Sequence, residues 1–88
     1  MKIKSVAPMS DYRVLVSYEN GLQCILDVKP WINGDWYGEL HDVEYFNKVR
    51  PHTLLGAIEW PNGQDIAPED IIQFGVKISE PQNALYSA

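Results

Sequence analysis

Cysteine is almost absent from this chain, which has Cys24 alone among its 88 residues. A single cysteine forms no disulfide within the chain and no zinc cluster, a pattern typical of the reducing cytoplasm. His41 and His52 are far apart in the sequence and have no cysteine near them, whereas a zinc site needs three or four ligands. The sequence therefore predicts no metal site and a cytoplasmic protein.

Basic side chains are also few, with 7 Lys and Arg against 12 Asp and Glu and a net charge of −5. They form no run of the kind that nucleic acids or anionic membranes attract. No apolar stretch approaches the roughly 18 residues of a membrane helix, and residues 1–5 lack the apolar run of a signal peptide. We expect no nucleic-acid binding by the domain itself and no membrane partner, whereas an acidic chain suits a basic protein partner.

Motifs of catalysis are missing as well. The serines stand in no nucleophile elbow, the glycines form no phosphate loop, and Cys24 falls on an apolar strand face as a small hydrophobe. We expect no catalytic residue and no cofactor. What is present, 45% apolar and 22% charged residues, is ordinary for one small globular domain with a thin core.

The clearest predicted structure is a β-hairpin of residues 12–18 and 22–28 around an Asn-Gly turn. A two-residue turn would pair Val16 with Ile25, and a three-residue loop would pair Val16 with Cys24. A slip of one residue exchanges the faces of a strand, so the cleaner separation of apolar from polar side chains favours the three-residue loop. That register leaves Leu15 and Ile25 apolar on the polar face, which suggests partial covering, with a second copy of the chain as one candidate.

A second hairpin is predicted around Pro61-Asn62-Gly63, with Gly63 closing a three-residue loop. This register sets Glu59 directly opposite Asp65. Like charges across a ladder are destabilising, so this pair must be exposed, screened or neutralised by a partner.

Two short helices complete the prediction. Asp42 is a suitable N-cap for a helix from Val43 to about residue 47, with Val43 and Phe46 facing the sheet. Pro68 begins the other helix, Ile71, Ile72 and Phe74 anchor it, and Gly75 ends it. With a first strand at residues 3–8, the fold class is α+β, a mainly antiparallel sheet in one domain over residues 1–75, followed by a C-terminal tail over 76–88 that is ordered only if it docks.

Two groups of side chains are candidates for function. Trp31, Trp36 and Tyr37 crowd an irregular loop, and aromatic residues of this kind are enriched at interface hot spots. Covering a thin core is the favoured interpretation, with Trp36 as the more exposed residue. A candidate binding surface comprises Trp31, Trp36, Tyr37, Leu15 and Ile25.

The second group is a candidate motif site of Glu59, Trp60, Asp65 and Glu69. Its carboxylates are of the type that serves acid–base catalysis or holds a hard cation, but acidic residues near a helix start also complement the helix dipole. We favour the helix start, in which Asp65 bonds exposed backbone N–H groups.

The motif Trp-Pro-Asn-Gly-x-Asp-Ile-x-Pro-Glu, from Trp60 to Glu69, resembles the signature of a small bacterial family, the domain-of-unknown-function family number two-four-four-two. Weaker matches lie upstream at Tyr18-Glu19-Asn20-Gly21, at Leu26-Asp27-Val28, and at Glu39-Leu40 with Phe46. The resemblance covers about residues 5–72 and implies a compact α+β domain with an antiparallel sheet. It also implies a regulatory, antitoxin-like role, since some members are encoded beside small toxin-like proteins; others are fused to a helix-turn-helix domain, for which this chain has no room.

Three functional hypotheses remain. The leading one is a non-enzymatic protein-binding or regulatory module whose partner is another protein or itself, with a homodimer expected. The second is a small-molecule or metal-dependent enzyme that uses Asp65 and Glu69. The third is a structural subunit of a homo-oligomer.

Overall fold

The computed structural model describes residues 2–52 and 56–79 of the chain, which fold around two antiparallel sheets. The larger sheet has the strand order β1-β2-β3-β7, with β1 at Ile3–Met9, β2 at Arg13–Tyr18, β3 at Gln23–Asp27 and β7 at Val76–Ser79. The smaller sheet contains β4 at Arg50–Pro51, β5 at Ile58–Glu59 and β6 at Asp65–Ile66. The two predicted hairpins thus lie in separate sheets.

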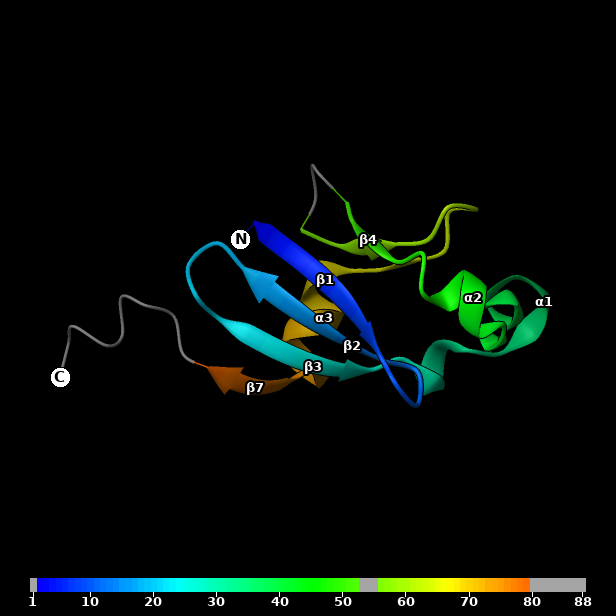
Figure 1. The fold of residues 1–88 in the computed structure, drawn as a ribbon, viewed down its shortest axis with the longest axis horizontal. Helices are drawn as coiled ribbons and strands as arrows, with labels where there is room; N and C mark the ends of the chain where they lie inside the picture. The colour runs from blue at the N-terminus through cyan, green and yellow to red at the C-terminus, as the bar shows by residue number, and fades with distance from the viewer. Residues whose placement is uncertain (1, 53–55, 80–88) are drawn as a thin grey trace, which may run out of the picture.

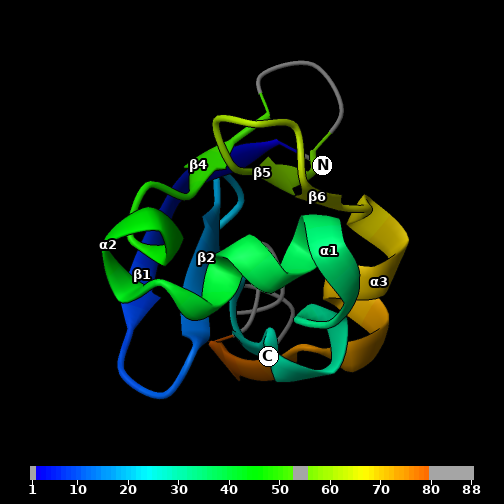
Figure 2. The same cartoon turned by 90° about the vertical axis from the view of Figure 1, so that its right-hand side faces the viewer.

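Helices are short and fall between the strands. They are α1 at Gly34–Tyr37, α2 at Val43–Phe46 and α3 at Pro68–Phe74, with 3-10 turns η1 at Lys29–Trp31 and η2 at Gly38–His41. Figure 1 shows α3 behind the larger sheet, and Figure 2 shows α1 and α2 across one end of the molecule with the smaller sheet above them. The α+β class is confirmed, and α1 adds to the two predicted helices.

Both hairpins adopt the predicted registers. In the first, Val16 lies opposite Cys24, and the Tyr18 amide donates to the Leu22 carbonyl at 2.9 Å. In the second, the Trp60 amide donates to the Gln64 carbonyl at 2.8 Å. The glycines that close the two loops, Gly21 and Gly63, have φ of 96° and 100°, the region that favours glycine.

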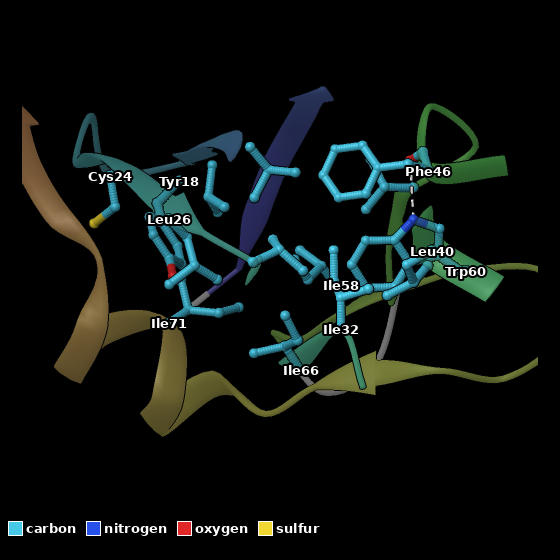
Figure 3. Close-up of a cluster of buried hydrophobic side chains, with 14 of the residues drawn as sticks. Tyr18, Cys24, Leu26, Ile32, Leu40, Phe46, Ile58, Trp60, Ile66 and Ile71 are labelled. Atoms are coloured by element: carbon cyan, nitrogen blue, oxygen red, sulfur yellow. Dashed lines mark hydrogen bonds between the residues drawn. The ribbon is translucent and has the colours of Figure 1, made fainter. Parts of the chain in front are cut away.

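The buried face of the first hairpin forms one side of the core. Its inward side chains alternate with outward ones, as the period of two in a strand requires. The core gathers side chains from both sheets and from α3 (Figure 3), and its largest fully buried members are Trp60, Phe46, Leu26, Leu40, Ile58, Ile66 and Ile71.

Two residues expected in the core lie on the surface instead. Val43 is 56% exposed, because α2 makes a single turn and Phe46 alone fills the contact with Trp60, at a centroid distance of 5.8 Å. Phe74 is also 56% exposed, since it stands at the end of α3 and packs edge-on against Trp31.

The beginning of the tail expected over residues 76–88 is docked on the domain. Residues 76–79 dock as strand β7 beside β3, while 80–88 lie outside the described residues. Gly75 ends α3 as predicted, and its lack of a side chain lets the end of α3 lie close to β3. A Cβ at this position would lie 2.5 Å from the Ile71 carbonyl oxygen and 3.1 Å from the Cys24 Cβ.

Candidate functional site

The family-like motif begins with Trp60, which joins the β5–β6 hairpin to the helical end of the molecule. Its ring is fully buried, and its indole N–H donates to the Phe46 carbonyl at 2.9 Å (Figure 3). A buried indole needs such an acceptor, because an unpaired polar atom in the core is costly. Trp60 is therefore a structural residue with no surface to offer a ligand.

Gln64 is the polar residue on the apolar face of this hairpin, and every bond it needs is made inside the chain. Its side-chain carbonyl accepts from the Tyr45 hydroxyl at 2.7 Å. Its amide donates to the Trp36 carbonyl and to the Glu39 carboxylate, both at 3.0 Å. The Glu39 carboxylate also accepts from the Asn62 side chain at 2.8 Å. The hairpin tip is thus bonded to α1, η2 and α2 by a satisfied polar network.

One of the two opposed acids of this hairpin, Glu59, is paired with a basic side chain of a neighbouring strand. Glu59 lies opposite Asp65 on one side and opposite Arg50 on the other. The Arg50 Nε is 2.9 Å from a Glu59 carboxylate oxygen, and His52 Nε2 is 3.9 Å from the other oxygen. Pairing with Arg50 offsets the charge of Glu59, and Asp65 is exposed to solvent, so two of the outcomes that the sequence left open occur together.

Asp65 and Glu69 are exposed and have different surroundings. The N-cap of α3 is Ala67, which makes no side-chain cap, so the expected capping by Asp65 is not the arrangement found. Glu69 instead borders a groove of about 380 Å³, together with Tyr18, Pro68, Ile72 and Gln73, and neither Asp65 nor Trp60 lines it. Across residues 2–52 and 56–79, no three His, Cys, Asp or Glu side chains gather to hold a metal ion.

The aromatic residues of the candidate binding surface lie in two places. Trp31 and Tyr37 pack against the core, whereas Trp36 is 54% exposed. The Tyr37 hydroxyl donates to the Asp65 carbonyl at 3.0 Å. Trp31 lies at the far end of η1, where it borders a hollow of about 320 Å³ with Asp27, Pro30 and Phe74.

Leu15 and Ile25 mark a third surface, the outer face of the larger sheet. They lie directly opposite each other, with Ala7 of β1 opposite Leu15 and Val76 of β7 opposite Ile25. Residues directly opposite in a sheet share a face, so these four form an apolar row across all four strands. We call Ala7, Leu15, Ile25 and Val76 the apolar row. Sequence reasoning missed its two ends, since it gave residues 3–8 no pairing register and assigned 76–79 to a tail.

The neighbours of the apolar row on this face are polar and already hydrogen-bonded. Gln23 donates to the Ser17 hydroxyl at 3.0 Å, and the Ser79 hydroxyl donates to the Gly21 carbonyl at 2.7 Å. On the other side, the Arg13 guanidinium donates to the Ser10 carbonyl at 3.1 Å. A partner that covers the row would therefore leave few of these groups unpaired.

Charge is unevenly divided over the molecule. Residues 2–29 together with β7, which build the larger sheet, carry five basic and three acidic side chains. Residues 30–75, which build the helices and the smaller sheet, carry two basic and eight acidic ones. The acidic excess of the chain therefore lies away from the larger sheet.

Comparison with protein families gave one match. The model of a family described as "Protein of unknown function (DUF2442)" matches residues 3–76. Neither the curated proteins nor the solved structures gave a match. Within the described part of the chain, no helix is long and apolar enough to cross a membrane.

Proposed function

Since the chain belongs to the DUF2442 family, whose function is unknown, we propose that it is a non-enzymatic module that binds protein. The observation that carries this proposal is the apolar row on the outer face of the larger sheet. No described helix covers that face in Figure 1, whereas α3 covers the other. Leu15 and Ile25 are only partly buried there, and Val76 is 66% exposed. A contiguous apolar patch with a polar rim is typical of a protein interaction site.

The surrounding polar groups support the same proposal. An interface needs a buried apolar centre and a rim whose hydrogen bonds are satisfied. The pairs Gln23–Ser17 and Ser79–Gly21 meet that requirement before any partner arrives. The outer face therefore loses little hydrogen bonding when it is covered.

The family resemblance favours a regulatory, antitoxin-like role for this binding module. We propose that its protein partner is in the cytoplasm. The buried, free thiol of Cys24 is compatible with that compartment. The enzymatic alternative has less support, because neither Asp65 nor the fully buried Trp60 lines the groove that Glu69 borders.

The proposal is tested with two variants that make the same chemical change in different places. Ile25→Lys puts a charge in the apolar row, and Val43→Lys puts the same charge on α2, where the side chain is already 56% exposed. Tagged wild type and both variants are used to capture partners from the native cell, after circular dichroism shows that each is folded. We expect one protein to be recovered with wild type and Val43→Lys and lost with Ile25→Lys. Equal recovery with all three, or loss with Val43→Lys alone, would place the interaction elsewhere.

A further inference from the structure

Strand β7 is an open edge of the larger sheet. It stands last in the strand order, and Figure 1 shows no other described strand or helix along its outer side. At the opposite edge, β1 contacts β4 and is partly covered by it. An open edge presents unpaired backbone N–H and C=O groups, which are able to pair with a further strand.

Exposed apolar side chains concentrate at this edge. Five large hydrophobic residues in the described chain are more than half exposed, and two of them, Val76 at 66% and Ile78 at 51%, lie on this one strand. Natural edges are normally protected by charge, by bulges or by shortness. Strand β7 has one lysine, Lys77, and a register shift against β3, yet it keeps two exposed aliphatic residues in four positions.

We propose that a second copy of this chain adds its own β7 to this edge in antiparallel orientation, which joins the two larger sheets into one. This inference rests on the proposed binding function and names one of its partners. Val76 ends the apolar row at β7, so the added strand lies beside the end of that row in each copy. A two-fold axis relates the two copies, and in the register that we propose it passes through the pair of Ile78 residues. Lys77 of each copy then lies opposite Ser79 of the other, so the two Lys77 side chains do not face each other directly.

The charge distribution favours a second copy as the occupant. Two chains of net charge −5 repel each other, and the repulsion is weakest where they meet by surfaces that are not acidic. The larger sheet is the part of the molecule with a basic excess, and β7 forms its edge. Antiparallel pairing turns the second copy by a half-turn about an axis perpendicular to the sheet, so the acidic ends that carry α1 and α2 lie at opposite ends of the joined sheet (Figure 1).

Sedimentation of wild type and two lysine variants tests the inference. Val76→Lys adds charge to the row at the β7 edge, and Ala7→Lys adds the same charge to the same row at β1. We expect wild type and Ala7→Lys to form dimers and Val76→Lys to be monomeric. A monomeric wild type would overturn the inference. Loss of the dimer in Ala7→Lys would also overturn it, because it would mean that the outer faces of the two larger sheets pack against each other.

A cross-linking experiment gives an answer even if Val76→Lys fails to fold. Ile78→Cys places an accessible thiol on the proposed axis, whereas the native thiol of Cys24 is buried. A short cross-linker with two thiol-reactive ends is added to Ile78→Cys and to a control variant, Ala7→Cys. We expect it to convert Ile78→Cys into a covalent dimer and to leave Ala7→Cys largely monomeric. Equal cross-linking of the two variants contradicts pairing at the edge. A monomeric wild type that still captures the Ile25-dependent partner would overturn this inference alone and leave the proposed function in place.

Discussion

Tyr18 is buried without a hydrogen bond to its hydroxyl group. Its side chain is 3% exposed, and its hydroxyl is the one buried side-chain polar atom without a hydrogen-bond partner among the described residues. A buried hydroxyl without a partner costs about 1–3 kcal/mol. Burial, with a smaller contribution from Cys24, raises the pKa of the phenol to about 12. Tyr18 at the end of β2 is therefore held in its neutral form.

Replacing Tyr18 with phenylalanine should leave the fold unchanged at neutral pH and stabilise it by up to about 1–2 kcal/mol. Above pH 10 the difference in the free energy of unfolding between the two proteins should grow. The unfolded tyrosine ionises near pH 10 and the folded one only near pH 12, so wild type loses stability between these values by about 1.4 kcal/mol per pH unit. Urea unfolding of both proteins from pH 8 to 11.5 measures the difference, and the other tyrosines cancel in it. A constant difference across this range would show that Tyr18 ionises freely in the native state.

The loop glycines act at the scale of the hairpin. Gly63 has φ of 100°, whereas Gly38 has an ordinary helical φ of −59°, and added methyl groups meet no severe contact at either position. Gly63→Ala should therefore cost about 1–2 kcal/mol from backbone strain, while Gly38→Ala should be neutral or slightly stabilising. Thermal melts of the two variants provide the comparison. Similar melting temperatures would contradict the three-residue loop.

The hydrogen-bond network at the hairpin tip depends on Tyr45. Its hydroxyl donates to the Gln64 side chain at 2.7 Å and accepts from the Asn62 amide at 2.8 Å, and Gln64 is fully buried. Tyr45→Phe should therefore cost about 1–3 kcal/mol, because it leaves a buried acceptor unpaired. Tyr37→Phe removes one hydrogen bond to an exposed residue and should cost less, about 0.5–1.5 kcal/mol. Chemical denaturation of both variants measures the two losses, and equal losses would mean that Gln64 finds another donor.

The elements that the sequence predicted best are those whose signals are local. Turn residues and the period of two defined both hairpins, because Gly21 and Gly63 select the loop and the loop selects the register. The side chains at helix ends were harder to place. Val43 and Phe74 have the spacing of core residues, but a single-turn helix and a helix terminus leave them outside the core. Helix α1 gave no signal, since its four residues are too few to show a period.

At the scale of the whole molecule, the candidate surfaces depended on contacts between distant segments. Leu15 and Ile25 were visible in the sequence because they share a hairpin. The complete apolar row was not, because Ala7 and Val76 join it through pairings of β1 and β7 that turn chemistry does not specify. The ion pair of Glu59 with Arg50 also depends on a pairing of β4 with β5 for which the sequence predicted no register. Local patterns therefore predicted the faces, and the tertiary fold determined what lies beside them.

The last prediction concerns whether β7 belongs to the domain. Two shortened chains are compared, one ending after Gly75 and one ending after Ser79, so that they differ only by β7. The shorter chain loses the pairing of Gln23, Cys24 and Ile25 with β7 and uncovers the edge of β3. Three lost cross-strand pairs should cost roughly 2 kcal/mol, which lowers the melting temperature of a domain this size by about 8 °C or more.

The melts need a range of protein concentrations, because β7 is also the proposed surface for the second copy. Stability that comes from dimerisation falls on dilution, whereas stability that comes from the β3–β7 ladder does not. A gap between the two shortened chains that persists at the lowest concentration would show that β7 stabilises the monomer. If the gap closes on dilution, β7 contributes through the second copy alone, and the domain boundary predicted at residue 75 would hold for the monomer.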